Sequence, residues 1–322
     1  MQRYIALIIG MLSLSPLFQD ESYTRWRMIV LEVIYLTLYI MVALSFMLWL
    51  YYIAPWGDTV SKKIFHNYGY TGLFSTGLIM SLAAAIVAII SLARLLEKRG
   101  PHPVMSYLPI FTVSFILCIA GGSRITVGGL GVSIVMLLIF KRKQVTQLFR
   151  LRLSRWVTGV VLILIAVSIP KAYHSLKLKS DYAQSYGTIF YSRHDLWNAR
   201  IAEWESSPLT GIGYANEFPS SRNNNGDLTV MEPGSSWLSV LSYSGLLGGA
   251  AFVWLFIWFG HKIVVNPLSR TGTQLSLFLL FILNGFSEGW LLFAGSFLFP
   301  IFWLVVSLTS FKDESVKIGI GK

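Results

Sequence analysis

The stretch YTGLFSTGLIMSLAAAIVAIISLA, residues 70–93, contains no charged side chain. A backbone that lies in the hydrocarbon of a bilayer must satisfy its own hydrogen bonds, so an apolar run of this length is typical of a membrane-spanning helix. Seven other runs have the same character, one of them interrupted only by Glu32; they are residues 28–54, 104–123, 125–140, 156–170, 235–260, 271–287 and 289–311. We therefore predict eight spans. Residues 4–18 add a shorter stretch that is a ninth span, a re-entrant element or a signal-like region, and a retained span is favoured.

The composition of the 322-residue chain agrees with this prediction. Apolar residues make up 54% of the chain and charged residues 13%, against about 25% charged residues in an ordinary soluble domain. The mean hydropathy is +0.62. We predict an all-α polytopic membrane protein with about 8–9 transmembrane helices and one large extracytoplasmic loop that contains short helices. Cys118 is the only cysteine, which excludes an internal disulfide and the usual cysteine metal sites.

The net charge of +11 indicates topology rather than a nucleic-acid partner. Short connections with clustered cations are typical of the cytoplasmic side of a membrane. One such connection contains Arg94, Lys98 and Arg99, and the next but one contains Lys141, Arg142, Lys143, Arg150, Arg152 and Arg155. This orientation predicts N-terminal transmembrane helices in residues 1–170, a large periplasmic loop in residues 171–234, and C-terminal transmembrane helices with a cytoplasmic tail in residues 235–322.

The loop contains a predicted helix at about residues 193–205. Ser192 and Asp195 have the spacing of a capping box, and the helical pattern continues until Pro208. Spacings of four, three and four positions place four residues on one face, namely Arg193, Trp197, Arg200 and Trp204, and leave Asp195, Asn198 and Glu203 on other faces. Guanidinium groups bind phosphate in a bidentate manner, and indole rings stack on sugars or lie at a membrane interface. The face therefore suits a glycosyl phosphate, and an amphipathic helix anchored on lipid is the alternative.

The segment PLTGIG, residues 208–213, follows this helix. Proline ends the helix, and Gly211 and Gly213 permit a positive φ or the close approach of another group. The segment follows no strand and lacks a third glycine, so a dinucleotide site is excluded.

The segment GGSR, residues 121–124, joins two apolar runs at the predicted outer mouth of the helices. Ser123 is expected to cap a helix there, and Arg124 needs a partner or ligand unless it snorkels at the helix end. The glycines that follow are expected to let neighbouring helices approach, and they are Gly128, Gly129 and Gly131. Glu288 lies between the last two apolar runs, where it either pairs with Arg124 or a loop arginine, or orients an acceptor.

Three segments carry a resemblance to a known family: AGGSRITVGGLGVSIVMLL (120–138), SRHDLWNARIAEWESSPLTGIGYANEF (192–218) and SSWLSVLSYSGLLGG (235–249). In this order they resemble the O-antigen ligase and polymerase family of bacterial integral membrane glycosyltransferases. The resemblance implies a periplasmic loop and a cleft for a glycan on undecaprenyl pyrophosphate. It implies inverting transfer to a hydroxyl of another lipid-linked glycan, in polymerases, or of lipid A core, in ligases. No nucleotide sugar, metal or other cofactor is implied.

The chain departs from the family where the span after the loop begins. Family members commonly have a His-Asn pair there, whose histidine is a candidate base in ligases, but Gly234 and Ser235 occupy the aligned places. We expect Glu232 to take up the proton of the acceptor, with His194 as second candidate; otherwise departure of the pyrophosphate drives the reaction without a protein base. The string EPGSSW, residues 232–237, favours a polymerase over a ligase.

The hypothesis is a polymerase that joins undecaprenyl-pyrophosphate-linked repeat units into O-antigen, capsular polysaccharide or exopolysaccharide at the outer face of the bacterial inner membrane. Arg124, Arg193 and Arg200 would bind the pyrophosphate, and the sugar rings would lie against Trp197, Trp204 and Trp237. The expected partners are lipid-linked glycan, membrane lipids, a flippase and a chain-length regulator, with no nucleic acid. The alternatives are a ligase that uses lipid A core, a transporter or flippase that binds lipid-linked glycan without chemistry, and a structural membrane subunit.

Overall fold

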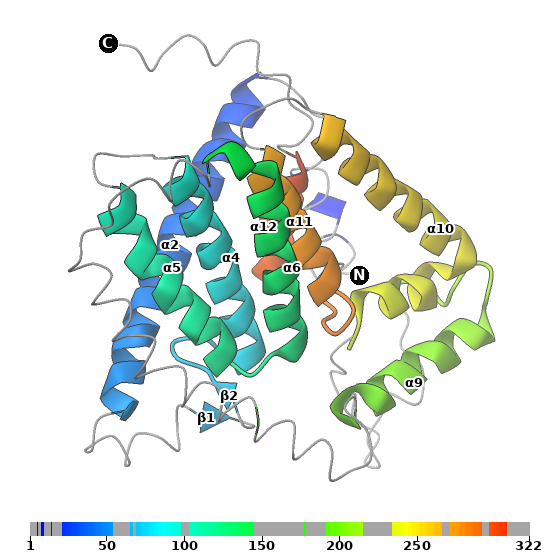
Figure 1. The fold of residues 1–322 in the computed structure, drawn as a ribbon. Coiled ribbons are helices and arrows are strands. Elements are labelled where there is room, and N and C mark those ends of the chain that lie inside the picture. Colours follow the sequence, from blue (N-terminus) through cyan, green and yellow to red (C-terminus); the bar gives the residue numbers. More distant parts are fainter. Residues whose placement is uncertain are drawn as a thin grey trace. The chain divides into compact units, whose positions relative to one another are not determined.

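The computed structural model describes residues 21–53, 65–66, 69–97, 103–144, 191–214, 234–265, 271–291 and 296–307, and single residues at positions 5, 8, 9, 14 and 177. These segments are helical, apart from connections and one short strand pair (Figure 1). The predicted span at 156–170 and most of the stretch 4–18 lie outside the described residues.

The helices overlap the predicted apolar runs, but α4 begins at Gly77 rather than at residue 70, and the predicted run 289–311 is helical only over Leu298–Ser307 among its described residues. In chain order the elements are α2 (Glu21–Ile53), β1 (Phe65–His66), β2 (Gly69–Tyr70), α4 (Gly77–Leu96), α5 (Pro103–Ala120), α6 (Arg124–Phe140), α9 (Tyr191–Ser206), α10 (Ser236–Val265), α11 (Thr271–Asn284) and α12 (Leu298–Ser307). The two strands form an antiparallel pair in which Phe65 lies opposite Tyr70. The all-α class is confirmed.

Three of these helices are long and apolar enough to cross a membrane, and they lie in Arg25–Tyr51, Gly77–Leu96 and Ser236–Val265. α5, α6, α11 and α12 are apolar but shorter. The number of spans, their orientation and the periplasmic position of the loop stay predictions. By contacts, the chain divides into two compact units, one of Met1–Leu31 with Phe190–Lys322 and one of Glu32–Ile189.

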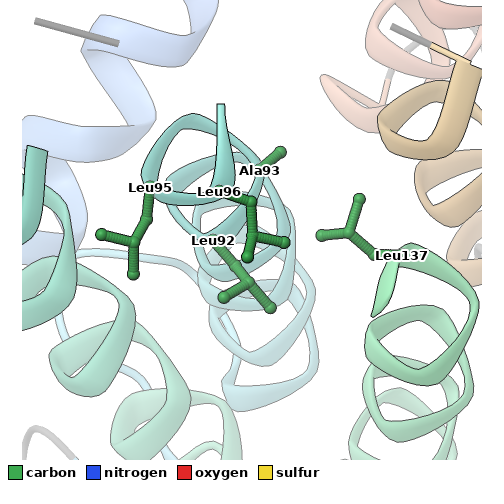
Figure 2. Close-up of a cluster of buried hydrophobic side chains, with 5 residues drawn as sticks. All are labelled: Leu92, Ala93, Leu95, Leu96 and Leu137. Carbon is green, nitrogen blue, oxygen red and sulfur yellow. The ribbon is translucent and has the colours of Figure 1, made fainter. Parts of the chain in front are cut away.

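In the unit Glu32–Ile189, α4 is the central helix, with α5 and α6 packed against it (Figure 1). Of the residues in its most apolar stretch, 83% are buried. The alanines of Leu82–Ala88 let the neighbouring helices approach. A cluster of buried leucines joins the ends of α4 and α6, where Leu137 of α6 points toward Leu92 and Leu96 of α4 (Figure 2). Protein surrounds most of α4, and this burial explains why its sequence carries no charge before Arg94.

Two ion pairs fasten the end of α4 that the sequence places near the cytoplasm. Arg94 pairs with Glu32 of α2 at 2.6 Å, and Lys141, the C-cap of α6, pairs with Glu97 at 2.9 Å. Lys141 is buried. Glu32, the acid that interrupts an otherwise apolar run, thus has a cation from the neighbouring helix.

The turn from α5 to α6 contains the predicted Ser-Arg motif. Gly122 has a φ of 73°, and Ser123 caps α6 by accepting a hydrogen bond from the backbone N–H of Thr126, so the predicted cap is confirmed. Gly121 lies against the backbone of Gly77 at the start of α4. This contact brings α4 and α5 together at the end opposite to the ion pairs.

The expectation for the glycines inside α6 is wrong at two positions. Gly128 and Gly131 are exposed, and among the described residues no heavy atom lies within 4 Å of the place that a Cβ would take. Gly129 is buried. Close packing therefore occurs at Gly121 in the turn rather than at the glycine pair of the helix.

The unit that contains residues 190–322 has an aromatic core between α10, α11 and α12. Phe256 of α10 stacks on Phe278 of α11 and on Phe302 of α12, with ring centroids 5.7 and 5.6 Å apart. Trp290 contacts Phe302 edge-on at 5.5 Å and donates a hydrogen bond to the side-chain oxygen of Asn284 at 2.8 Å. This core holds the loop of residues 285–291 close to the start of α10.

We expect Gly121→Ala to destabilise the protein by about 1–3 kcal/mol, because a Cβ at this position would lie 2.5 Å from the Gly77 carbonyl oxygen and would also meet Ser81 Oγ. Gly128→Ala is the matched control, since its Cβ meets nothing among the described residues and alanine favours a helix. Thermal unfolding in detergent, with abundance in membranes, measures both. Equal stability of the two variants would contradict the packing at Gly121.

Candidate functional site

α9 runs beside the first part of α10, and each end of α9 meets a different part of that helix (Figure 1). The helix predicted at about 193–205 occupies Tyr191–Ser206. We call Arg193, Trp197, Gly234, Ser236 and Glu288 the start cluster, because they surround the first turn of α10. We call Arg200, Glu203, Ser242 and Tyr243 the break cluster, because they lie where α10 is interrupted.

In the start cluster, Arg193 of α9 forms an ion pair with Glu288 at 2.5 Å. Of the pairings left open for Glu288, the structure shows the one with this loop arginine. Both side chains reach the surface, with 11% and 13% of their areas exposed. A guanidinium and a carboxylate are thus held side by side at an accessible place.

Ser236 fixes the position of Glu288 relative to α10. Its backbone N–H and its hydroxyl both donate to the carbonyl oxygen of Glu288, at 3.0 and 2.6 Å, and its hydroxyl accepts from the N–H of Leu291 at 3.2 Å. The main chain of residues 285–291 is therefore tied to the first turn of α10 by the N–H and the hydroxyl of Ser236, which leave little freedom to the Glu288 backbone.

Two of the predicted tryptophans lie at the start of α10. Trp197 is half-buried and donates its indole N–H to the carbonyl oxygen of Gly234 at 3.1 Å. Trp237 donates to the carbonyl oxygen of Ile282 at 3.4 Å and stacks on Phe286, with ring centroids 5.6 Å apart. The structure thus brings Arg193, Trp197, Trp237 and Glu288 together. The sugar-binding roles of the tryptophans stay predictions.

At the break cluster, α10 is interrupted at Gly245, which has a φ of 63° and a ψ of −165°. A continuous helix would pair the N–H groups of Leu246 and Leu247 with the carbonyls of Ser242 and Tyr243. Instead these N–H groups donate to the carbonyls of Pro208 and Leu209. The carbonyls of Ser242 and Tyr243 accept from the N–H groups of Ile212 and Gly213. The backbone of residues 208–213 thus replaces the missing helical bonds.

The predicted role of the glycines in residues 208–213 has a physical basis at this contact. Gly211 and Gly213 have φ values of 70° and 91°. A Cβ on Gly211 would lie 2.6 Å from the backbone N of Gly245, and a Cβ on Gly245 would lie 2.5 Å from the backbone N of Thr210. Two backbones can approach to hydrogen-bonding distance here only because both carry glycine.

An ion pair of Arg200 with Glu203, at 2.8 Å, is buried between α9 and α10, with 7% and 1% of the side chains exposed. Ser242 donates its hydroxyl to the Glu203 carboxylate. Arg200 donates to the Tyr243 hydroxyl at 3.1 Å and lies over its ring, 5.7 Å from the centroid. The expectation that Glu203 lies on another face than Arg200 is therefore wrong. Positions three apart on a helix are neighbours, and this spacing was the signal for the pair.

The other predicted site residues lie in less enclosed places. Trp204 is half-buried and donates its indole N–H to the carbonyl of Pro208 at 3.2 Å. His194 is exposed and lies within 3.1 Å of the side-chain nitrogen of Asn198. Arg124 is half-buried at the first position of α6, in the other unit, and Glu232 lies outside the described residues. The clamp of three arginines and the choice between Glu232 and His194 stay predictions.

This arrangement provides a cation for an anionic group, a carboxylate for a hydroxyl group and indole rings for an apolar sugar face. Among the described residues, no group of three or more His, Cys, Asp or Glu side chains could hold a metal ion.

We expect Glu203→Ala to cost about 3–5 kcal/mol in unfolding free energy, because it leaves the buried Arg200 guanidinium without its carboxylate. Glu205→Ala, an exposed position on the same helix, is the matched control and should change stability by less than about 0.5 kcal/mol. Unfolding in detergent measures both variants. A loss of similar size in Glu205→Ala would show that any substitution on α9 lowers the stability, and that the buried ion pair is not the cause.

The family model described as O-antigen ligase matches residues 109–253. The match extends from α5 through the Ser-Arg motif, α9 and residues 208–213 to α10 beyond its break, and covers less than half of the chain. No curated protein matches the chain. The match confirms the resemblance that the three segments predict, and it indicates a function of the ligase or polymerase kind without separating the two. Residues 109–253 are thus similar to the O-antigen ligase family, whose members are glycosyltransferase-like membrane enzymes.

Proposed function

We propose that the protein polymerises lipid-linked oligosaccharide repeat units at the outer face of the inner membrane. The donor is a glycan on undecaprenyl pyrophosphate, and the acceptor is a sugar hydroxyl of a second lipid-linked glycan. The family match supports membrane glycosyl transfer. The start cluster supports it further, because it holds a guanidinium and a carboxylate side by side, each partly exposed, with the Trp197 indole one turn of α9 away.

The observation that favours a polymerase over a ligase is the conformation of Gly234. This residue occupies the place that aligns with the histidine of the family's ligases, yet it has a φ of 72° and is buried. A Cβ there would lie 2.7 Å from Leu196 Cβ of α9. Since a histidine at this position would be strained and would collide with α9, the chain does not use the arrangement implied for ligases.

In this proposal, Arg193 is the α9 arginine that meets the donor pyrophosphate. Its guanidinium reaches the surface, whereas Arg200 is buried against Glu203 and Tyr243. The Cα atoms of Arg193 and Arg200 lie seven residues apart, which is about 10 Å along the axis of α9. Each guanidinium therefore remains near its own carboxylate. Arg200 then contributes by holding α9 on α10, and Arg124 is the second proposed phosphate ligand. Positive charge at the leaving group stabilises the negative charge that develops as the pyrophosphate departs.

The test is transfer in membranes that contain the protein and a labelled lipid-linked repeat unit. A ladder of lengthened lipid-linked products supports the polymerase. Product attached only to lipid A core would support the ligase. Movement of labelled lipid across vesicles by purified protein, without any lengthening, would support a transporter and end the enzyme proposal.

We expect Arg193→Lys to lower chain elongation roughly tenfold to a hundredfold, because lysine keeps the charge but loses the planar fork that binds phosphate in a bidentate manner. Arg124→Lys should have a similar effect. Arg142→Lys, exposed at the end of α6, is the control and should elongate normally. The measurement is the initial rate of elongation at matched protein abundance.

If Arg193→Lys and Arg124→Lys both elongate at the wild-type rate, the phosphate-binding role is wrong. Arg193 would then serve to anchor α9, which is the alternative that its sequence pattern left open.

A further inference from the structure

We propose that Glu288 is the proton acceptor of the transfer reaction, which is a role that rests on the proposed polymerase function. The substrate group is the hydroxyl of the acceptor sugar. The proposal stands on four features of the structure, which are the fixed backbone of Glu288, its ion pair, its accessible side chain and its aromatic surroundings.

The backbone of Glu288 is fixed near Gly234, the residue that stands where the family's ligases have a histidine. Both polar groups of Ser236 donate to the Glu288 carbonyl, and Ser236 follows Gly234 by two residues. A proton acceptor has to be held within hydrogen-bond reach of the hydroxyl that it deprotonates. Glu288 therefore supplies a carboxylate next to the place where Gly234 has no side chain to offer.

The ion pair with Arg193, at 2.5 Å, holds the Glu288 carboxylate in a fixed place. A carboxylate accepts hydrogen bonds from hydroxyl groups. Glu203 also has a guanidinium partner, but only 1% of its side chain is exposed, and its carboxylate already accepts a hydrogen bond from Ser242. Glu205 is exposed on α9. Of these three carboxylates of the unit, Glu288 combines a fixed cation with access from the surface.

The aromatic surroundings of Glu288 suit a sugar. Trp197 lies one turn of α9 beyond Arg193, and Trp237 stacks on Phe286, two residues before Glu288, while its ring also packs against Phe252 and Phe256. Indole rings lie against the apolar face of a sugar, while carboxylates accept hydrogen bonds from its hydroxyl groups. A sugar that lies against Trp197 would therefore be one turn of α9 from Arg193 and its carboxylate partner.

The step balances as follows. The acceptor O–H proton passes to the Glu288 carboxylate while the acceptor oxygen bonds to the anomeric carbon of the donor. The bond from that carbon to the pyrophosphate oxygen breaks, and its electron pair leaves with undecaprenyl pyrophosphate. Glu288 then releases the proton to water.

Proton transfer to Glu288 also changes the charge around Arg193. As the carboxylate becomes neutral, the guanidinium loses its counter-charge at the moment when negative charge develops on the leaving pyrophosphate. The interaction between Arg193 and the leaving group is thus stronger in the transition state than in the ground state, which is the condition for acceleration of the chemical step.

The experiment compares elongation by membranes that contain Glu288→Ala or Glu288→Gln with membranes that contain the wild type, at matched abundance. We expect a loss of about 10²–10⁴-fold in both variants. Formate at high concentration should restore part of the activity of Glu288→Ala, because a small carboxylate enters the vacated space and takes the proton. Formate should not restore Arg193→Ala. Glu205→Ala is the control and should elongate normally.

Wild-type rates for Glu288→Gln would overturn the inference. So would a loss in Glu288→Ala that formate does not relieve, or normal elongation by Glu288→Gln beside a loss in Glu232→Gln or His194→Gln. If Glu288→Ala does not accumulate, Glu288→Gln alone decides, since glutamine preserves the shape of the side chain. Absence of polymer from the wild type would contradict the proposed function instead, which keeps the two failures distinguishable.

Discussion

The hydrogen-bonding demand of the backbone at the interruption of α10 is the constraint on which the candidate site depends. In apolar surroundings an unsatisfied N–H or carbonyl group is costly, so a helix can be interrupted there only where protein supplies the missing partners. Residues 208–213 supply four such bonds across Gly245. This attachment holds the C-terminal end of α9 to α10, and it determines which residues of α9 face the first turn of α10.

The interruption also divides α10 into two parts with different uses. Residues 246–265 extend for about 30 Å at the rise of an α-helix, which equals the thickness of the hydrocarbon core of a bilayer. Residues 236–244 are therefore not needed to complete a span. They carry three buried serines, Ser236, Ser239 and Ser242, whose hydroxyls bond to the neighbouring loop, to the carbonyl of Ser235 and to α9. This part of α10 serves as a base for α9 and for the loop of residues 285–291.

The sequence predicted the parts that depend on local rules. Apolar runs predicted the described helices, the capping pattern of Ser123 predicted the start of α6, and the helical pattern that ends before Pro208 predicted α9, although Ser192, the predicted cap, lies inside this helix, which begins at Tyr191. The packing of Gly128 and Gly131 was wrong because a helix face with small residues packs closely only where a neighbour lies against it. The pair of Arg200 with Glu203 was missed because a one-face pattern treats acids on a helix as solvated, whereas burial against Ser242 and Tyr243 requires the acid beside the cation.

The contact of Arg193 with Glu288 shows a further limit of sequence reasoning, because 95 residues separate its two members. A search for a proton acceptor near the vacated histidine position leads along the chain to Glu232, or to His194 on the loop helix. The fold offers another neighbour, since a left-handed Gly234 packed on Leu196 leaves no room for a side chain at position 234. Whatever group serves this position must then come from a segment that packs against the first turn of α10. The loop that Ser236 binds is such a segment, and it brings a carboxylate that already lies beside a cation. Hydrogen bonds from the N–H and the hydroxyl of Ser236 thus hold a residue from a distant part of the chain near the start of α10, where the local sequence has only glycine.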